Sequence, residues 1–252
     1  MPLFTFHRVT YAYPTQRQRP ALDDFSLTIP AGEKIAVVGR NGSGKSTFFL
    51  HLNGLLKPRA GEVQFRGQPL DYTRQGLKRL RQQVALVFQN PDDQLFSASV
   101  FQDISFGPLN LGLSQEEARE RVREAAAICD IEHLLQRPTH ALSGGEKARV
   151  ALAGVLAMRP DALALDELMA SLDPWGRGSI RNILDAYHAR GKTILLITHD
   201  LGLVRHWATW VIVVHEGGAI FSGRTDDLLQ AQDIMDETGL TQIWREAMQN
   251  CL

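Results

Sequence analysis

The sequence predicts an α/β fold: a mostly parallel sheet with helices on both faces, an N-terminal antiparallel β layer and an inserted helical subdomain. Three observations predict it. Apolar runs typical of buried strands recur at residues 35–38, 162–165, 193–197 and 210–214. Residues 1–35 instead carry short alternating stretches. Residues from about 90 to 142 lose strand character.

The N-terminal stretch predicts the antiparallel layer beside the core. Its apolar residues alternate in two short runs, Phe4 and Phe6, then Phe25, Leu27 and Ile29. Turn signals bound these runs at Pro14, Pro30 and Gly32.

The middle of the chain predicts the helical subdomain, over about residues 90–155. Ser114 and Glu117 have the spacing of a capping box. The apolar residues that follow on one helical face are Ala118, Val122, Ala125 and Cys129.

The first chemical motif is the glycine loop after the strand at 35–38. Residues 39–46 match G-x-x-x-x-G-K-[ST], and an apolar helical run follows them. Glycines let backbone N–H groups point at phosphate oxygens, and the helix N-terminus adds positive potential. Lys45 supplies charge for the outer phosphates, and the Ser46 hydroxyl can ligate magnesium. The expected nucleotide-binding residues here are Gly39, Asn41, Gly42, Ser43, Gly44, Lys45, Ser46 and Thr47.

The second motif is Leu142-Ser143-Gly144-Gly145-Glu146, ahead of a helical run from Ala148 to Met158. Two glycines and a serine at a helix N-terminus offer an anion free N–H groups, a hydroxyl and positive dipole potential. Two anion sites in one chain indicate that each holds the same triphosphate from opposite sides, across a dimer. The alternative is an ordinary helix start, because Ser143 and Glu146 complete a capping box.

Polar residues follow three further predicted strands. Asp166 and Glu167 end the apolar run at 162–165, His199 follows the strand at 193–197, and Gln89 follows residues 84–88. Because the strand before them is wholly apolar, we do not interpret Asp166 and Glu167 as ordinary solvent-exposed acidic residues. A histidine at a strand end is often a satisfied structural group.

In order and spacing, these motifs resemble those of ATP-binding cassette (ABC) ATPases over nearly the whole chain. The corresponding elements are Walker A at 39–46, the Q-loop at Gln89, the signature at 142–146, Walker B at 163–167, the D-loop at Ser171-Leu172-Asp173 and the switch histidine at His199. The resemblance implies a P-loop NTPase core, the ABC ATPase fold, and hydrolysis of ATP with Mg²⁺.

The resemblance also implies the catalytic roles. Glu167 positions or deprotonates the attacking water, and His199 contacts the γ-phosphate. Ser46, Gln89 and Asp166 are the expected magnesium ligands. Gln89 also links the magnesium to the partner protein.

Other residues complete the nucleotide site by the same resemblance. Ser143, Gly144 and Gly145 close over the γ-phosphate of the other subunit, and Asp173 belongs to the same set. Tyr13 is expected to stack on adenine, and a strand tyrosine on a half-buried face is the alternative.

Three stretches are similar to the ATPases of energy-coupling factor (ECF) transporters, namely residues 88–96, 103–113 and 149–158. Within that group the chain is most similar to the cobalt or nickel uptake ATPases named CbiO or NikO. This implies a second ATPase subunit in a homodimer, a transmembrane scaffold protein and a substrate-binding membrane subunit. The chain would then be peripheral, on the cytoplasmic side of the cell membrane. The scaffold's coupling helices are expected at Asp92, Asp93 and Gln94, with a solvated Asn-Pro turn as the alternative.

Other functions share some of these motifs. An ECF ATPase for a vitamin and a soluble assembly ATPase, as in iron–sulfur cluster biogenesis, stay open. A P-loop small-molecule kinase has no use for residues 142–146. A DNA-repair ATPase splits its halves with a long coiled coil, and the sequence has no heptad-rich insertion.

Two sites depart from the family pattern. Leu168 and Met169 replace the usual proline and threonine, which predicts a less rigid turn toward Asp173. Glu146 replaces the commoner glutamine and adds negative charge near a phosphate-facing helix end. We expect hydrolysis to survive both changes, because neither replaced residue performs the chemistry.

Composition bounds the remaining possibilities. The chain has 252 residues and a formal net charge of −1, which gives no electrostatic reason for a nucleic-acid partner. Cys129, Cys251 and the eight histidines show no metal-ligand spacing, so a transported metal is not selected here. No apolar run approaches the ~20 residues of a membrane helix, and no signal sequence is expected.

We expect an ABC ATPase domain over residues 1–222 and a short helical C-terminal extension over 223–252. In ECF ATPases such an extension helps join the two ATPase subunits. Ile243, Trp244 and Met248 are therefore candidate contacts, with packing on the chain's own domain as the alternative.

Overall fold

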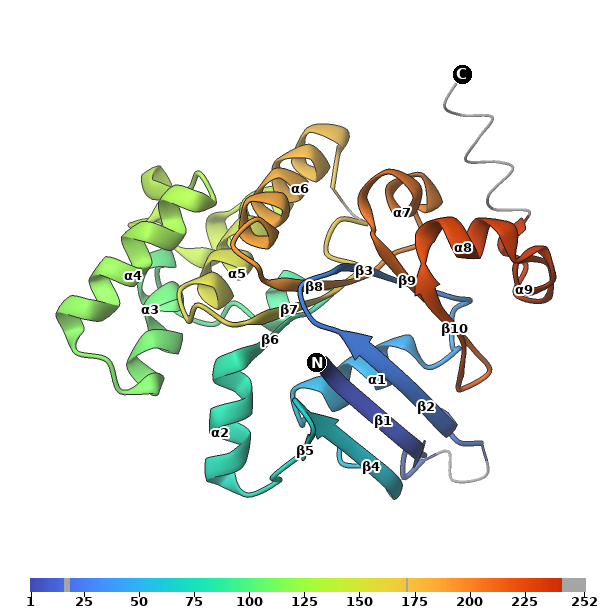
Figure 1. Cartoon of the computed structure of the whole chain (residues 1–252). Coiled ribbons are helices and arrows are strands. Elements are labelled where there is room, and N and C mark those ends of the chain that lie inside the picture. The colour runs from blue at the N-terminus through green and yellow to red at the C-terminus, as the bar shows by residue number, and fades with distance from the viewer. Residues whose placement is uncertain (16–18, 171, 242–252) are drawn as a thin grey trace. The chain divides into compact units, whose positions relative to one another are not determined.

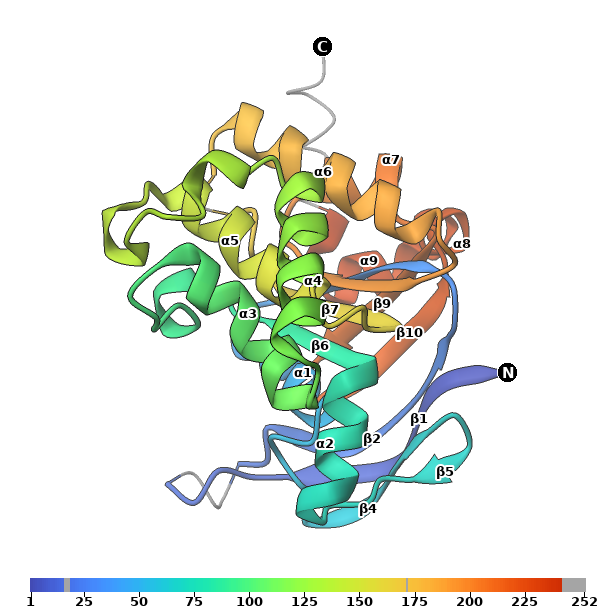
Figure 2. The same cartoon turned by 90° about the vertical axis from the view of Figure 1, so that its left-hand side faces the viewer.

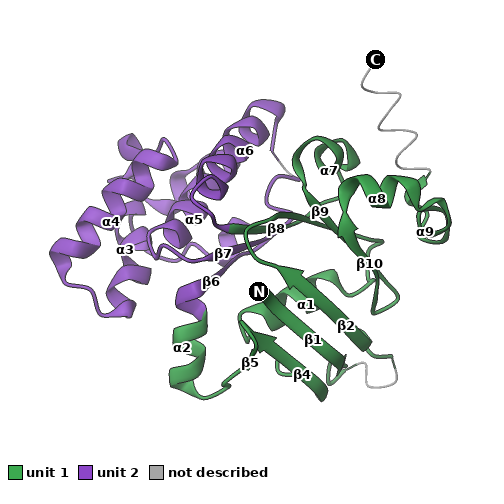
Figure 3. Cartoon of the chain, in the orientation of Figure 1, with its two compact units in different colours: residues 1–80, 193–252 green, residues 81–192 purple. Residues whose placement is uncertain are grey.

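The computed structural model describes residues 1–15, 19–170 and 172–241. They divide into two compact units, residues 1–80 with 193–252 and residues 81–192 (Figure 3). Helix α2 (Arg74–Gln83) runs across the boundary at residue 80. The predicted α/β class, with its antiparallel layer and helical subdomain, is confirmed.

The antiparallel layer opens the first unit (Figure 1). Within the described residues its strand order is β2-β1-β4-β5, with bounds β1 (Pro2–Tyr11), β2 (Leu22–Pro30), β4 (Ala60–Phe65) and β5 (Gln68–Pro69). Phe6 of β1 pairs with Leu27 of β2 and with Val63 of β4. The predicted alternation therefore corresponds to a sheet with one buried face, on which Phe4 and Phe6 lie.

The parallel layer of the first unit carries the glycine loop. Its order is β10-β9-β3-β8, with bounds β3 (Lys34–Val38), β8 (Thr193–Ile197), β9 (Trp210–His215) and β10 (Gly218–Arg224). β8 and β9 run parallel to β3, which pairs Val37 with Ile197 and with Ile212. Strands β3, β8 and β9 are buried almost throughout, which explains their continuous apolar runs. Because β3 and β8 end at the same edge, residues after Val38 and after Ile197 emerge together.

Helices pack against both layers of this unit. They are α1 (Lys45–Leu52), α7 (Leu201–Trp207), α8 (Thr225–Gln230) and α9 (Gln232–Glu237). Phe48 of α1 contacts Phe6 and Phe25, with ring centroids 5.2 and 5.3 Å away, so the antiparallel layer fixes α1. β10 continues through Arg224, past the boundary expected at residue 222, before α8 and α9 begin. The candidate contacts Ile243, Trp244 and Met248 lie outside the described residues.

The second unit joins two parallel strands to the helical subdomain. The strands are β6 (Val84–Val87) and β7 (Ala162–Asp166). Its helices are α3 (Val100–Leu111), α4 (Gln115–Ile128), α5 (Gly144–Leu156) and α6 (Pro174–His188), with one-turn helices η1 (Pro91–Asp93), η2 (Glu132–Leu134) and η3 (Thr139–Ala141). α3, α4 and α5 pack against one another (Figure 2). α4 starts with the predicted capping box of Ser114 and Glu117.

Candidate functional site

The glycine loop joins β3 to α1 in a backbone conformation that favours glycine. Gly39, Gly42 and Gly44 have φ angles of 148°, 76° and 110°. A Cβ at Gly39 would lie 2.1 Å from the Val214 carbonyl oxygen, and one at Gly44 would lie 2.5 Å from the Ala21 oxygen. The packing of this unit therefore requires glycine at positions 39 and 44.

Three side chains of the loop fit a phosphate group. The Lys45 ammonium donates to the carbonyl oxygens of Gly39 and Arg40, at 2.8 and 2.9 Å, which holds its charge at the loop. The Ser43 hydroxyl is buried without a hydrogen-bond partner in the described residues, so an incoming phosphate oxygen could satisfy it. Ser46 is exposed at the start of α1, where its hydroxyl could ligate magnesium that arrives with a nucleotide.

Tyr13 lies beside the first turn of α1. Its hydroxyl is 3.2 Å from the Thr47 hydroxyl, and its ring meets that of Tyr11 edge-on at 5.2 Å. Tyr11 in turn contacts the ring of His51, whose Nδ1 is 2.8 Å from the Thr47 carbonyl oxygen. Burial lowers the pKa of His51, so the ring is neutral and Nδ1 donates this bond. Tyr11 lies two residues before Tyr13 in the sequence, whereas His51 is not predicted by the motifs, because only the fold brings it to Tyr11.

His199 and the glycine loop share one pocket of the first unit. The pocket measures about 290 Å³, and its lining includes Gly39, Asn41 and the exposed His199. Thr238 and Leu240, from the end of the chain, line it too. The structure thus brings together two predicted motifs that lie some 160 residues apart in sequence, as the parallel pairing of β3 with β8 requires.

The ends of β6 and β7 bring Gln89 and Glu167 together in the second unit. Val87 pairs with Leu165, so both strands end at one edge. The Gln89 side-chain amide donates to the Glu167 carboxylate at 3.2 Å. Glu167 has a φ of 47°, a left-handed conformation that costs a non-glycine residue ~1 kcal/mol or more. Backbone strain at this acid, next to Asp166, is typical of functional positions.

The signature element begins α5 as a complete capping box. The Glu146 carboxylate accepts from the Ser143 N–H at 2.7 Å, and the Ser143 hydroxyl accepts from the Glu146 N–H at 3.4 Å. Gly144 and Gly145 have no positive φ, and a Cβ at either would meet no heavy atom within 4 Å in the described chain. Neither capping nor packing explains the glycine pair.

The extra charge of Glu146 has a local counterion. Arg137 donates to the Glu146 carboxylate at 3.0 Å and to the Ala141 carbonyl oxygen at 2.7 Å. The Ser143 N–H lowers the pKa of Glu146 most, and the Ser143 hydroxyl, Arg137 and Arg149 lower it further. Sequence reasoning missed Arg137, since nothing in the motif indicates its partner.

The segment after Gln89 is tied to the signature helix. Lys147 of α5 forms an ion pair with Asp92 at 2.6 Å, and the Gln94 amide donates to the Ala151 carbonyl oxygen at 3.1 Å. Beyond it, the rings of Phe96 and Phe106 pack edge-on at 4.8 Å although 66% and 49% of their surfaces are exposed. An apolar pair this open to solvent is typical of an interaction surface.

The turn from Asp166 toward Asp173 contains the two residues that depart from the family pattern. Leu168 and Met169 are both buried, although a less rigid turn is expected from them. Asp173 is the N-cap of α6 and accepts from the Gly176 N–H at 2.6 Å. The remaining D-loop residue, Ser171, lies outside the described residues.

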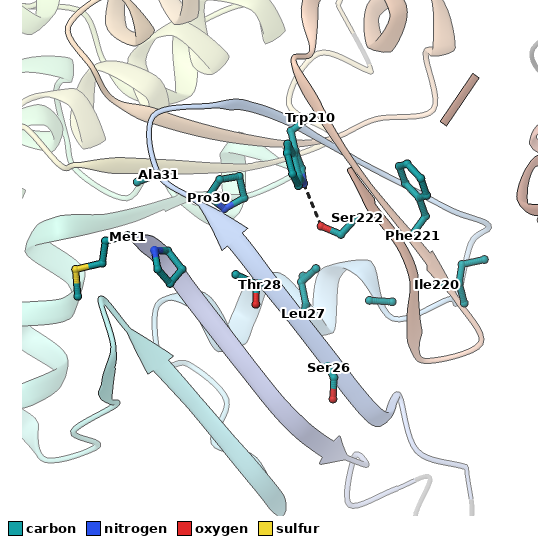
Figure 4. A pocket seen from close by; sticks show the side chains of 12 residues that line it. Met1, Ser26, Leu27, Thr28, Pro30, Ala31, Trp210, Ile220, Phe221 and Ser222 are labelled. Atoms are coloured by element: carbon teal, nitrogen blue, oxygen red, sulfur yellow. Dashed lines mark hydrogen bonds between the residues drawn. The ribbon is translucent and has the colours of Figure 1, made fainter. Parts of the chain in front are cut away.

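Another pocket of the first unit lies between β2 and β10 (Figure 4). It measures about 640 Å³, and its wall includes Trp210, whose indole N–H donates to the Ser222 hydroxyl at 3.0 Å. The predicted site residues in the described part of the chain are not among its lining.

Over residues 1–15, 19–170 and 172–241, no three His, Cys, Asp or Glu side chains are grouped to hold a metal ion. In that same part of the chain, no helix combines the length and the apolar character needed to cross a bilayer.

Known proteins match this chain over most of its length. The family model for the ABC transporter matches residues 22–170. The cobalt import ATP-binding protein CbiO of Rhodobacter capsulatus is 46% identical over 95% of this chain and 85% of that protein. The energy-coupling factor transporter ATP-binding protein EcfA2 of Methanospirillum hungatei is 44% identical over 93% of this chain and 58% of that protein.

Two solved structures share the fold. cbiO1 of Clostridium perfringens, part of the ABC transporter complex cbiONQ, matches with a TM-score of 0.82 and 40% identity, over 100% of this chain and 99% of that one. The ATP-binding cassette MJ0796, solved as a dimer in a post-hydrolysis state bound to ADP and Pi, matches with a TM-score of 0.80 and 26% identity, over 88% and 98%.

Proposed function

The chain belongs to the ABC transporter family, as an ATP-hydrolysing subunit of the energy-coupling factor type, and we propose that it powers the import of cobalt through membrane partners. Cobalt is supported by 46% identity to the CbiO of Rhodobacter capsulatus, over 85% of that protein. The chain itself does not select the metal in this proposal. Selection falls to a substrate-binding membrane subunit, and a transmembrane scaffold protein connects the two.

The reaction centre is shared between two copies of the chain. The observation that carries this proposal is the glycine pair at 144 and 145, which its own surroundings do not require. A nucleotide held by the partner copy would need that space, because a side chain there would block approach to the N–H groups at the start of α5. The MJ0796 cassette dimer, solved with ADP and Pi, supports the same arrangement.

The phosphate loop of one copy holds the triphosphate. Its inward N–H groups and the start of α1 attract the phosphates, and the Ser43 hydroxyl gains a partner on binding. Lys45 exchanges bonds with the loop's own carbonyl oxygens for bonds to phosphate oxygens. Ser46, Gln89 and Asp166 would hold Mg²⁺, which neutralises charge on the phosphates when bound. Tyr13, whose hydroxyl lies 3.2 Å from the Thr47 hydroxyl of α1, would stack on the adenine.

Glu167 acts on the attacking water. Its carboxylate can accept a proton from the water, and the amide of Gln89 orients it. His199, beside the glycine loop, would donate to the γ-phosphate. Ser143 and Gly145 of the partner copy stabilise the same group through the N-terminus of α5. Hydrolysis removes the phosphate that joins the two copies, so the dimer opens.

In this proposal the segment after Gln89 transmits the opening of the ATPase dimer to the scaffold protein. Asp92 and Asp93 offer negative charge, and Phe96 with Phe106 offers an apolar surface, so a short helix with basic and apolar residues fits. Such a helix would hold the chain at the cytoplasmic side of the membrane. The ion pair of Asp92 with Lys147 connects this surface to the signature helix.

Cobalt uptake tests the proposal. Cells that express this chain with its scaffold and substrate-binding subunits should accumulate radioactive cobalt, and Lys45→Ala in this chain should abolish accumulation. Excess nickel and excess vitamins serve as competitors. Uptake that continues in the Lys45→Ala cells, or a vitamin taken up in place of cobalt, would contradict the proposal.

A further inference from the structure

Residues 225–241 pack on the part of the first unit that holds His199. Thr225 is buried, and its hydroxyl donates to the Ala208 carbonyl oxygen at 2.7 Å. Its N–H donates to the Thr209 carbonyl oxygen at 3.3 Å. These bonds attach the segment to the residues that end α7, and Figure 1 shows α8 beside α7. Its beginning is therefore part of the folded unit.

The far end of this segment reaches the His199 pocket. Thr238 and Leu240 are 2% and 4% exposed, and both line the pocket of about 290 Å³ that contains Arg40 and His199. The Thr238 hydroxyl donates to the Ile234 carbonyl oxygen at 2.7 Å, so this wall is fixed to α9. Leu228 is equally buried at 2% but lies outside the described lining of that pocket.

His199 occupies a short turn between β8 and α7. Asp200 caps α7 by accepting from the Leu203 N–H at 2.9 Å, and its own N–H donates to the Thr198 hydroxyl at 3.0 Å. Leu201, the first residue of α7, lines the same pocket as Leu240. A helix of 7 residues is not stable alone, so the packing around α7 determines where this turn lies.

We propose that residues 225–241 position His199, and that Leu240 is the positioning residue. Leu240 and Leu201 line the same pocket as His199, and His199 lies on the turn that directly precedes α7. This inference rests on the proposed role of His199 at the γ-phosphate. It assigns the described part of the extension to catalysis within its own copy, distinct from any role in joining two copies.

Leu240→Ala tests this inference against Leu228→Ala. Both changes remove a buried leucine from the extension, so both should lower the unfolding temperature. We expect Leu240→Ala to lower kcat for ATP about tenfold with KM unchanged, because a misplaced catalytic group loses rate steeply. Leu228→Ala should retain kcat, and Leu240→Met should restore it by refilling the pocket wall. An equal loss of kcat in both alanine variants, or none in Leu240→Ala, would overturn the proposal.

A double-mutant cycle separates this inference from the proposed function. If Leu240 acts through His199, then Leu240→Ala should cause no further loss of kcat in a His199→Ala background. Additive losses would overturn the positioning role alone. Full turnover by His199→Ala would instead refute the role of His199 itself, and this inference with it.

Discussion

The glycines of the phosphate loop and those of the signature element relate differently to the chain around them. At Gly39 and Gly44 a Cβ would collide with backbone oxygens, at 2.1 and 2.5 Å, and φ is positive at both. At Gly144 and Gly145 the backbone is helical and a Cβ would meet nothing within 4 Å in the described chain. The first pair is required by the fold of its own unit, and the second pair is not.

This difference indicates that the phosphate loop is complete within its own unit, whereas the signature element needs a partner. The phosphate loop has its lysine, its buried hydroxyl and its strained glycines in one unit. The signature has a satisfied cap, yet it keeps two glycines in the first turn of α5, where alanine would fit and has the higher helix propensity. The fold of this unit does not need these two glycines, so their lower helix propensity indicates that a binding partner needs them.

The largest expected effect is that of Gly39→Ala. The new Cβ must displace the Val214 backbone, and alanine resists a φ of 148°, so we expect a loss of ~3 kcal/mol or more in unfolding free energy. ATP turnover should disappear. Gly42→Ala is the matched control, because φ is 76° there but the added Cβ would meet no heavy atom of the described chain within 4 Å. Its loss of unfolding free energy should be ~1–2 kcal/mol. Urea unfolding measures the loss of unfolding free energy in both variants. Equal losses would contradict the view that the collision with Val214 makes glycine necessary at position 39.

Glu167→Gln should affect chemistry and leave folding intact. The amide keeps the shape and an acceptor for Gln89 but cannot take a proton, so turnover should fall roughly a hundred- to thousandfold. ATP binding and ATP-dependent dimerisation should persist, as size-exclusion chromatography with ATP can show. Glu124→Gln, in the ion pair of α4 with Arg159, is the control and should retain turnover. Normal turnover by Glu167→Gln would refute its role.

Gly145→Ala tests the other half of the comparison. We expect unfolding free energy to stay equal or rise by up to ~1 kcal/mol, while turnover falls about a hundredfold because the partner's γ-phosphate is blocked. Gly154→Ala is the matched control, since Gly154 lies in the same helix and a Cβ there would also meet no heavy atom of the described chain within 4 Å. That variant should keep turnover. If Gly145→Ala were as active as Gly154→Ala, the glycine pair would need another explanation.

Mixing two inactive variants shows whether the site is shared. A dimer of one Lys45→Ala copy and one Gly145→Ala copy contains one site with both Lys45 and Gly145 intact. The mixture should therefore hydrolyse ATP faster than either variant alone. A mixture as inactive as its components would contradict a site built from two copies.

Local patterns of sequence predict most of the fold and the motifs. The strand expected at 193–197 is found at Thr193–Ile197, and the runs at 35–38 and 162–165 each gain one residue in β3 and β7. Such strands are predictable because burial on both faces leaves an unbroken apolar run. The capping boxes at Ser114 and Ser143 depend on residues three apart and are equally readable.

The contacts that tune the site could not be predicted in this way. Lys147 pairs with Asp92, and Leu240 lines the His199 pocket, because the fold brings distant segments together. Arg137 pairs with Glu146 across the turns that precede α5. No local rule indicates which arginine or leucine meets a motif. The positions of Gly39, Gly42 and Gly44 could be predicted, because at a positive φ the backbone itself restricts the choice of residue.

The smallest expected effect is that of Glu146→Gln, which gives the signature its commoner residue. The folded-state pKa of Glu146 is lowered, so its contribution to stability is present at pH 7 and is lost as pH falls through that lowered pKa. We expect the variant to be less stable than wild type by under ~1 kcal/mol at pH 7, and the difference to shrink at acidic pH as Glu146 becomes protonated. Glu117→Gln, in the capping box of α4, should show the same pH dependence, because the pKa of Glu117 is lowered in the same direction.

ATP binding distinguishes these two capping boxes. Removing the charge of Glu146 should tighten apparent ATP binding by less than about fivefold, because a charge at a helix N-terminus is worth at most ~1 kcal/mol and Arg137 already offsets it. Glu117→Gln should leave ATP binding unchanged, since none of the expected phosphate contacts lies in α4. If both variants changed ATP binding equally, the effect would come from stability alone, and the signature helix would not face a phosphate.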